Sequence, residues 1–232
     1  MKNIEYTQMA YLYDKFYTNK KYNNEVAFIE SFIKNKNCNI LDAGCGTGNH
    51  AKILNELGYN IQGFDKSPNM IEIANTKIPN NFFVHDLLIP LSTNEKYDMI
   101  ISFFAVFNHL KNYKQFKTAL SNLKSLVNKE GFIIIDLHNP QSNGTKIESI
   151  DNTTRIMKWH RFPILNKELS KITYKINNKI YKTRHVFTIF KINKLTQIAK
   201  RLGFSEVLFF ENYNTQRPAT ELSKNIQMVL KV

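Results

Sequence analysis

The stretch Ile40-Leu41-Asp42-Ala43-Gly44-Cys45-Gly46-Thr47-Gly48-Asn49-His50 decides the fold of this chain. An apolar segment runs into an acidic residue, and glycines follow at every second position. Glycine has no Cβ, so the backbone can turn sharply there and lie close to a ligand. A helix that begins directly after such a loop offers free N–H groups and the positive end of its dipole to the ligand. The stretch therefore predicts a strand, a loop that binds a nucleoside cofactor, and a helix.

The glycine spacing separates two classes of cofactor loop. Dinucleotide-binding loops follow the pattern G-x-G-x-x-G, in which the pyrophosphate rests on the helix N-terminus. Here Asn49 occupies the place of the third dinucleotide glycine, and Asp42 at the strand end would repel a pyrophosphate. A carboxylate at that position suits a ligand that carries a positive charge. An isolated glycine string would fit an ordinary strand–helix turn equally well, so the neighbouring segments have to decide.

The next strand supplies a second acidic residue. After a short helix over residues 51–57 and Gly58, residues 59–64 read as a strand that ends at Asp65. An acidic residue about 20 positions after a glycine loop, at the tip of the second strand, can accept both ribose hydroxyls. The alternative is that Asp65 caps the helix that Ser67-Pro68 opens. Paired with the glycine loop, the ribose role is favoured.

Strands and helices continue to alternate along the first half of the chain. Residues 81–85 read as a strand ending at Asp86-Leu87, and residues 97–104 and 131–136 read as buried, apolar strands separated by a helix over residues 112–126. This alternation is typical of a doubly wound, Rossmann-like α/β sheet, which binds ligands at the carboxyl ends of its strands. Four residues of separate elements fall at those ends: Asp42, Asp65, Asp86 and Phe103.

The segment over residues 151–190 departs from this rhythm. Residues 156–162, 169–176 and 179–187 look like strands, and Asn177-Asn178 would turn the second into the third. We expect an antiparallel insertion that covers the cofactor crevice or contacts a second subunit in a homodimer. A helix over residues 194–202 and strands over residues 206–210 and 225–232 follow. The chain is thus expected to form a single domain, with an N-terminal helical cap (1–37), a cofactor core (38–140), the insertion (151–190) and a last helix with two strands (191–232).

Composition indicates which classes of protein are disfavoured. The 232 residues carry a net charge of +13, but the lysines are scattered through every region, so a solvated surface is favoured over an RNA-binding face. Two cysteines, Cys38 and Cys45, argue against a disulfide framework and fit the cytoplasm. We expect no secretion signal and no membrane span. The histidines and cysteines lack the close paired spacing of a metal site, so none is expected.

Several motifs together resemble one family. D-x-G-x-G-x-G resembles motif I of the class I S-adenosylmethionine-dependent methyltransferases. The chain looks most like the deoxysugar N,N-dimethyltransferases and glycine N-methyltransferase-like enzymes among them. Further elements of that resemblance cover nearly the full length: Ala10-Tyr11-Leu12-Tyr13-Asp14, Tyr22-Asn23-Asn24-Glu25, Gly46-Thr47-Gly48-Asn49-His50, Ser67-x-x-Met70, Phe107-Asn108-His109-Leu110 and Arg184-His185-Val186-Phe187-Thr188-Ile189-Phe190.

The resemblance implies a seven-stranded sheet that ends in an antiparallel hairpin, and S-adenosylmethionine as cofactor. It also implies how the cofactor is held. The methionine part would lie against Ala43, Gly44 and Gly46, with Tyr22 near its carboxylate. Asp65 would hold the ribose. The remaining positions border the adenine or face the cofactor: Lys66, Met70, Asp86, Leu87 and Phe103.

The same resemblance implies methyl transfer to an amine or hydroxyl of a small molecule, such as a sugar nucleotide. Tyr13 and His109 match positions close to the reacting methyl group. His109 would take a proton or orient the acceptor; the alternative is a helix-start residue bound to the backbone, and Tyr13 could equally be a packing aromatic. His138 is a second candidate base, and His185 either lines the substrate pocket or lies on the surface of the insertion.

The segment Asp136-Leu137-His138-Asn139-Pro140 departs from the sugar enzymes, which carry an acid, a proline and paired tryptophans there. The acceptor is therefore expected to differ. Two other functions stay open. A tRNA wobble-base methyltransferase would use the same fold and would gather lysines at the crevice mouth. A non-catalytic cofactor-binding protein is disfavoured because the crevice residues are all present.

Overall fold

The computed structural model describes residues 6–17, 20, 22–177 and 179–232. A central sheet confirms the expected α/β class, with strands in the order β11-β10-β12-β5-β4-β1-β2-β3. Strands β1 to β5 are parallel, and β10, β11 and β12 are antiparallel to their neighbours. The sheet has one strand more than the seven expected. Its strands are β1 (Asn39–Ala43), β2 (Asn60–Asp65), β3 (Phe82–Val84), β4 (Tyr97–Ser102), β5 (Val127–His138), β10 (Glu206–Glu211), β11 (Asn214–Pro218) and β12 (Asn225–Lys231).

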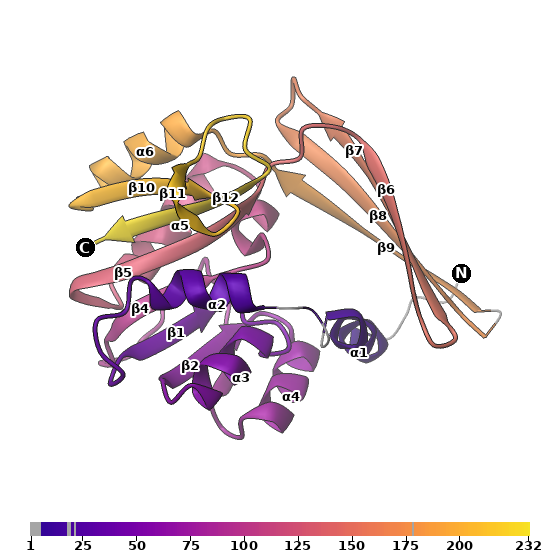
Figure 1. Ribbon diagram of the computed structural model, residues 1–232, viewed down its shortest axis with the longest axis horizontal. Helices are drawn as coiled ribbons and strands as arrows, with labels where there is room; N and C mark the ends of the chain where they lie inside the picture. The colour runs from indigo at the N-terminus through magenta and orange to yellow at the C-terminus, as the bar shows by residue number, and fades with distance from the viewer. Residues whose placement is uncertain (1–5, 18–19, 21, 178) are drawn as a thin grey trace.

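Helices cover both faces of the central sheet (Figure 1). The helices are α2 (Asn23–Glu30), α3 (Asn49–Glu56), α4 (Pro68–Lys77), α5 (Tyr113–Lys124) and α6 (Ile192–Arg201), and a single 3₁₀ turn, η1 (Val106–His109), follows β4. Successive strand residues point to opposite faces. Ile40 therefore packs with α2, α3 and α4, whereas Leu41 packs with α5 and α6. Burial on both faces explains why β1, β4 and β5 are nearly continuous apolar runs.

A second, four-stranded antiparallel sheet stands beside the first (Figure 1). It consists of β6 (Gly144–Ile150), β7 (Thr153–Phe162), β8 (Lys167–Ile176) and β9 (Lys179–Thr188). It begins at Gly144 and so includes a strand before the expected insertion at residues 151–190. Asn177 directly follows β8 and has a φ of +43°, as a tight turn requires. Asn178 lies outside the described residues.

Helix α1 (Tyr6–Tyr17) lies between the second sheet and α4 (Figure 1). On the α4 side, Lys77 Nζ lies 2.6 Å from Asp14 Oδ1. On the other side, the Phe16 ring packs 5.9 Å from the Tyr174 ring, and the buried Arg155 guanidinium lies 4.3 Å above Phe16. The helix thereby joins the side of the central sheet that α4 covers to the second sheet.

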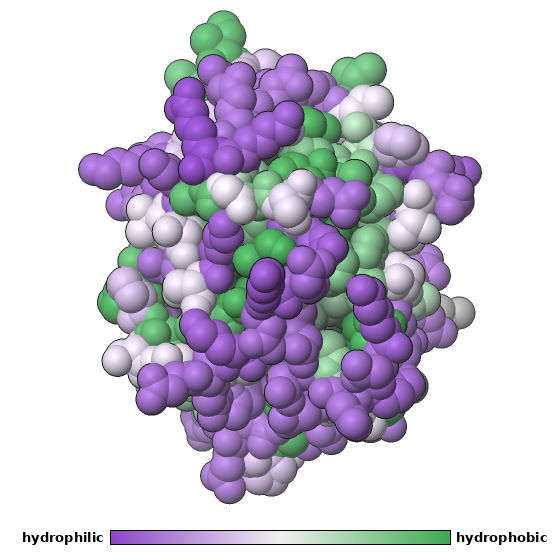
Figure 2. Space-filling model, turned by 90° about the vertical axis from the view of Figure 1, so that its left-hand side faces the viewer, coloured by the Kyte–Doolittle hydropathy of each residue, from purple (hydrophilic) through white to green (hydrophobic). Residues whose placement is uncertain are grey.

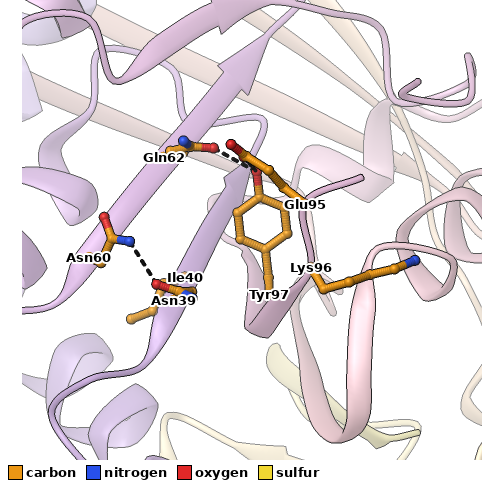
Figure 3. A pocket seen from close by; sticks show the side chains of 7 residues that line it. All are labelled: Asn39, Ile40, Asn60, Gln62, Glu95, Lys96 and Tyr97. Atoms are coloured by element: carbon orange, nitrogen blue, oxygen red, sulfur yellow. Dashed lines mark hydrogen bonds between the residues drawn. The ribbon is translucent and has the colours of Figure 1, made fainter. Parts of the chain in front are cut away.

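The amino ends of the parallel strands form the opposite side of the molecule. Figure 2 shows this side, where hydrophilic side chains dominate and an apolar area lies in the upper half. A polar hollow of about 310 Å³ opens there, lined by Asn39, Ile40, Asn60, Gln62, Glu95, Lys96 and Tyr97 (Figure 3). Its polar groups bond to one another, because Tyr97 donates to Gln62 Oε1 at 2.6 Å. The glycine loop and the acidic strand ends lie at the other end of the strands.

No helix in the described part of the chain is both long enough and apolar enough to cross a membrane.

Candidate active site

The glycine loop joins β1 to α3 and has the conformation that its sequence predicts. Gly44, Gly46 and Gly48 all have positive φ, at +83°, +55° and +76°. A Cβ on Gly44 would lie 2.6 Å from Val106 Cγ1, so only glycine fits there. A Cβ on Gly46 would meet nothing nearer than Tyr13 Cε1, at 3.9 Å. Open space therefore lies above Gly46, where a ligand can approach the backbone.

Two carboxylates lie at the ends of the strands that flank this loop. Asp42 is buried at the end of β1, and burial, followed by the nearby Asp65 charge, raises its pKa to about 8. Asp65 ends β2 and accepts hydrogen bonds from the N–H groups of Gly46 (3.1 Å) and Ser67 (2.9 Å). Burial raises the pKa of Asp65 as well. Paired, desolvated acids favour a ligand that donates hydrogen bonds or carries positive charge.

Two aromatic residues from the N-terminal segment close over the loop. Tyr13 lies over Gly46, and the Asp65 charge adds to burial in raising its pKa. Tyr22 is buried, and its hydroxyl donates to Tyr17 O at 3.0 Å and accepts from Asn49 Nδ2 at 3.2 Å. The structure therefore brings Tyr13 and Tyr22, which are far from the loop in sequence, to the predicted crevice.

The residues around the loop have the features that a cationic nucleoside cofactor needs. Thr47 Oγ1 and His50 Nε2 are buried beside the loop and form no hydrogen bond with any described residue. Such orphaned groups are costly unless a ligand or water pairs with them. Close by, the Lys20 ammonium lies 4.2 Å from the ring centre of Phe104 and 4.7 Å from that of Tyr22, and it pairs with the buried Glu25. The rings of Phe104 and Tyr22 and the Glu25 carboxylate thus stabilise a positive charge next to the loop. S-adenosylmethionine carries such a charge on its sulfonium, so these residues fit it.

The other predicted cofactor residues lie around the same strand ends. Lys66 is exposed and Met70 is half-buried on α4. Asp86 and Leu87 follow β3, where Asp86 Oδ1 accepts the N–H of Leu88 at 2.8 Å and Leu87 is buried. The Phe103 ring is buried between His50 (5.1 Å) and Tyr213 (6.1 Å). It belongs to the core beneath the crevice.

The loop after β4 is held in a strained conformation. Phe104 and Ala105 have φ angles of +61° and +57°, which cost energy in residues other than glycine. The N–H of Phe104 donates to Asp136 Oδ2 at 3.1 Å, and Gln227 Nε2 donates to Asp136 Oδ1 at 3.0 Å. These bonds hold the loop, and with it η1, against the end of β5. The left-handed backbone at Phe104 and Ala105 has no signal in the sequence.

A second group of side chains lies on the second-sheet side of the crevice. His109 ends η1, and its ring centre lies 5.5 Å from that of His185 and 4.7 Å from that of Phe187, both on β9. Burial, then His185 and Lys66, lower the pKa of His109. Burial and Lys66 lower the pKa of His185. Both imidazoles are therefore neutral at pH 7. The sequence left open whether His185 lines the substrate pocket or lies on the surface of the insertion. In the structure its ring packs against that of His109.

His138 lies next to this group and has a partner that sequence analysis missed. Its Nε2 lies 3.0 Å from Oε2 of Glu168, a β8 carboxylate that is 2% exposed. Asn108, fully buried, also escaped notice. It donates to His138 O (3.0 Å) and Thr188 O (2.8 Å) and accepts from the His138 N–H (2.9 Å). It therefore ties η1, β5 and β9 together at one point.

Within the described ranges, no group of three or more His, Cys, Asp or Glu side chains is arranged to hold a metal ion.

Comparisons with known proteins agree with this geometry. A methyltransferase domain model matches residues 13–208. An uncharacterized protein of Methanocaldococcus jannaschii is 30% identical over 92% of this chain and 80% of its own length. A dTDP-3-amino-3,6-dideoxy-alpha-D-glucopyranose N,N-dimethyltransferase of Streptomyces fradiae is 24% identical over 56% of this chain and 52% of its own. The crystal structure of an S-adenosylmethionine-dependent methyltransferase from Clostridium acetobutylicum superposes with a TM-score of 0.81, at 19% identity, covering 98% of both chains.

The chain belongs to this methyltransferase domain family. It is an S-adenosylmethionine-dependent methyltransferase, as the motifs around Gly44 and Asp65 predict.

Proposed function

We propose that the protein transfers a methyl group from S-adenosylmethionine to an amine or hydroxyl of a small molecule, such as a sugar nucleotide. The observation that carries this proposal is the adjacency of two groups of side chains at one end of the sheet. The acids and glycines at the ends of β1 and β2 suit a cationic nucleoside. The neutral imidazoles of His109 and His185 lie beside them and suit an acceptor that must reach the methyl group unprotonated.

The cofactor would be held mainly by backbone and carboxylates. In this proposal Ala43, Gly44 and Gly46 lie against the methionine part, with Asp42 beneath its positive charge and Tyr22 near its carboxylate. Asp65 binds the ribose hydroxyls, for which its two oxygens must exchange the present N–H partners. The adenine would be bordered by Lys66, Met70, Asp86 and Leu87, above the core that contains Phe103.

The cofactor supplies a methyl group already activated on a sulfonium. The protein's task is therefore to place the acceptor in line with that methyl group and to keep the acceptor unprotonated. The space above Gly46 is bounded by Tyr13, so we propose that Tyr13 packs against the acceptor or orients it. The neutral His109 would contact the acceptor from the second-sheet side.

An amino-sugar nucleotide is the acceptor class that we propose first. The support is the Streptomyces fradiae relative, whose name gives a dTDP-linked amino sugar. That match covers 56% of this chain. The departure at His138 lies on the acceptor side of the crevice, next to Phe187. We therefore infer the same class of chemistry without assigning the same sugar.

The distribution of cations argues against tRNA as the acceptor. Lys158, Lys171 and Arg184 are exposed and lie opposite one another on three neighbouring strands of the second sheet. Strand alternation puts them on the face that points away from His185 and Phe187, and so away from the crevice. A tRNA substrate would instead need its phosphate contacts around the crevice mouth. We also propose a cytoplasmic location, because both cysteines are free thiols.

The experiment that tests this function is a methyl-transfer screen with S-adenosylmethionine labelled on the methyl group. The acceptors are dTDP-3-amino-3,6-dideoxy-alpha-D-glucopyranose, glycine and bulk tRNA, each at low and at physiological salt. Label in the sugar or glycine reaction is the expected result. Label in the tRNA reaction alone, with a steep loss at higher salt, would contradict the small-molecule proposal.

A further inference from the structure

We propose that His138 accepts the proton that the acceptor loses, and that Glu168 is the positioning residue that makes it able to do so. This inference rests on the proposed methyl transfer and names the proton path of that same site. The proposed base lies at the end of β5, whereas His109 lies at the end of η1.

The geometry of the pair is that of an oriented imidazole. His138 Nε2 lies 3.0 Å from Glu168 Oε2, so the second ring nitrogen, Nδ1, is left for another partner. The side chain of His138 is 37% exposed, whereas that of Glu168 is 2% exposed. The His138 ring is therefore open to solvent and to a ligand on one side, while the carboxylate behind it is shielded from water. A buried carboxylate that holds a histidine from behind fixes both the tautomer and the direction of the ring.

The backbone around His138 is fixed as well. Asn108 bonds to both the N–H and the carbonyl of His138, and its amide also reaches Thr188 O at the end of β9. Because Asn108 directly precedes His109, the two imidazoles are held at a set separation across Phe187, which contacts both rings. A proton acceptor needs this rigidity, because misplacement by about 1 Å can cost about 100-fold in rate.

The charges around the two histidines decide between them. His109 is flanked by His185 and by the Lys66 charge, both of which oppose a new positive charge on its ring. Next to His138, by contrast, lies the carboxylate of Glu168. The register neighbours of Glu168 are Arg161 on β7 and Phe187 on β9, and the Arg161 guanidinium donates to Gln141 Oε1 at 3.3 Å. His138 therefore has a buried carboxylate as its partner, whereas the ring of His109 packs against the rings of His185 and Phe187.

The step balances without any further reagent. The lone pair of the acceptor nitrogen forms the new C–N bond, and the electrons of the C–S bond remain on sulfur. The N–H proton passes to His138, whose imidazolium faces the Glu168 carboxylate. From there the exposed side of the ring returns the proton to water. A hydroxyl acceptor would lose its O–H proton to the same atom.

The test compares Glu168→Gln and His138→Gln with the parent, using whichever of the three screened acceptors the parent methylates fastest. His160→Gln is the matched control, because His160 is exposed on the opposite face of the second sheet. We expect His138→Gln to lower kcat by about 100-fold or more, as for loss of a general base. Glu168→Gln should lower kcat by roughly tenfold and leave the KM of the acceptor nearly unchanged. The reason is that Glu168 orients the His138 ring and does not itself bind the acceptor.

Binding of S-adenosylmethionine, measured by calorimetry, should stay within about twofold of the parent in all three variants, since none of these residues lies at the glycine loop. Thermal unfolding checks that each variant folds; if His138→Gln does not, Glu168→Gln carries the test. A Glu168→Gln variant that raises KM by as much as it lowers kcat would show a structural role and overturn the proposal. Full activity in His138→Gln would overturn it too. A parent that methylates none of the three acceptors would instead contradict the proposed function, and this inference with it.

Discussion

Asn108→Ala tests whether a single buried side chain holds together the ends of η1, β5 and β9, where His109, His138 and His185 lie. The Asn108 side chain forms three hydrogen bonds, to His138 O, Thr188 O and the His138 N–H, at 2.8–3.0 Å. Each contributes about 1 kcal/mol, and unpaired buried partners cost more. We therefore expect the free energy of unfolding to fall by about 3 kcal/mol. For a chain of this size that is a fall in Tm of roughly 6–12 °C.

Urea unfolding followed by circular dichroism measures this change. Asn122→Ala is the matched control, because its side chain donates one hydrogen bond, to Leu87 O at 3.1 Å. It should cost about 1 kcal/mol. If Asn108→Ala cost no more than Asn122→Ala, the three bonds would not hold η1, β5 and β9 together. Because the same bonds position His138 next to the acceptor, kcat should fall in Asn108→Ala while the Kd of S-adenosylmethionine changes little.

Three further predictions concern the crevice. Gly46→Ala should cost only about 1–2 kcal/mol of stability, from its positive φ, because its Cβ has room; calorimetry should nevertheless show cofactor binding weakened by roughly tenfold or more, and unchanged affinity would place the ligand elsewhere. His109→Ala should slow turnover with cofactor affinity nearly intact, whereas equal losses in both would indicate a structural role. The raised pKa of Asp42 means that the folded protein binds this proton more tightly than the unfolded chain, so this carboxyl should contribute a loss of stability of the cofactor-free protein between about pH 4 and pH 8. In urea titrations, the stability of Asp42→Asn relative to the parent should therefore rise over this range, and a difference that stays constant with pH would contradict the reasoning.

The elements that sequence analysis predicted well carry strong local signals. The apolar strands β1, β4 and β5 lie between two layers of helices, so their central positions are hydrophobic. The glycine loop is set by residues that need positive φ, and it fixes the place of Asp42 and Asp65 without any distant contact. These features depend on neighbours in the chain, and a single sequence shows them.

Two strands lacked such a signal. The residues of β11 are exposed throughout and include a proline, so nothing but their hydrogen bonds to β10 marks them as a strand. Strand β6, at the edge of the second sheet, is mostly exposed and polar, and it follows Asn143 without a run of apolar residues. Edge strands of this kind are specified by their partners more than by their own composition.

The missed site residues share a physical cause. Glu168 is 30 positions from His138, and Asn108 is 80 positions from Thr188. A buried polar residue is defined by partners that the fold brings to it, and neither spacing forms a motif. Alternation along β8 does put Glu168 on the same face as the buried Tyr174. That pattern would have placed a carboxylate inside, which is a useful sign of function.

The most direct test of the central claim is calorimetric titration of the protein with S-adenosylmethionine, in the parent and in Asp65→Ala. Asp98→Ala is the control, since Asp98 binds the N–H of Asn39 at the opposite end of the sheet. The account predicts saturable binding by the parent, binding weakened in Asp65→Ala by about 1–3 kcal/mol, or roughly 5- to 150-fold in Kd, and no such loss in Asp98→Ala. A parent that does not bind the cofactor, or an Asp65→Ala variant that binds it as tightly as the parent, would contradict the account.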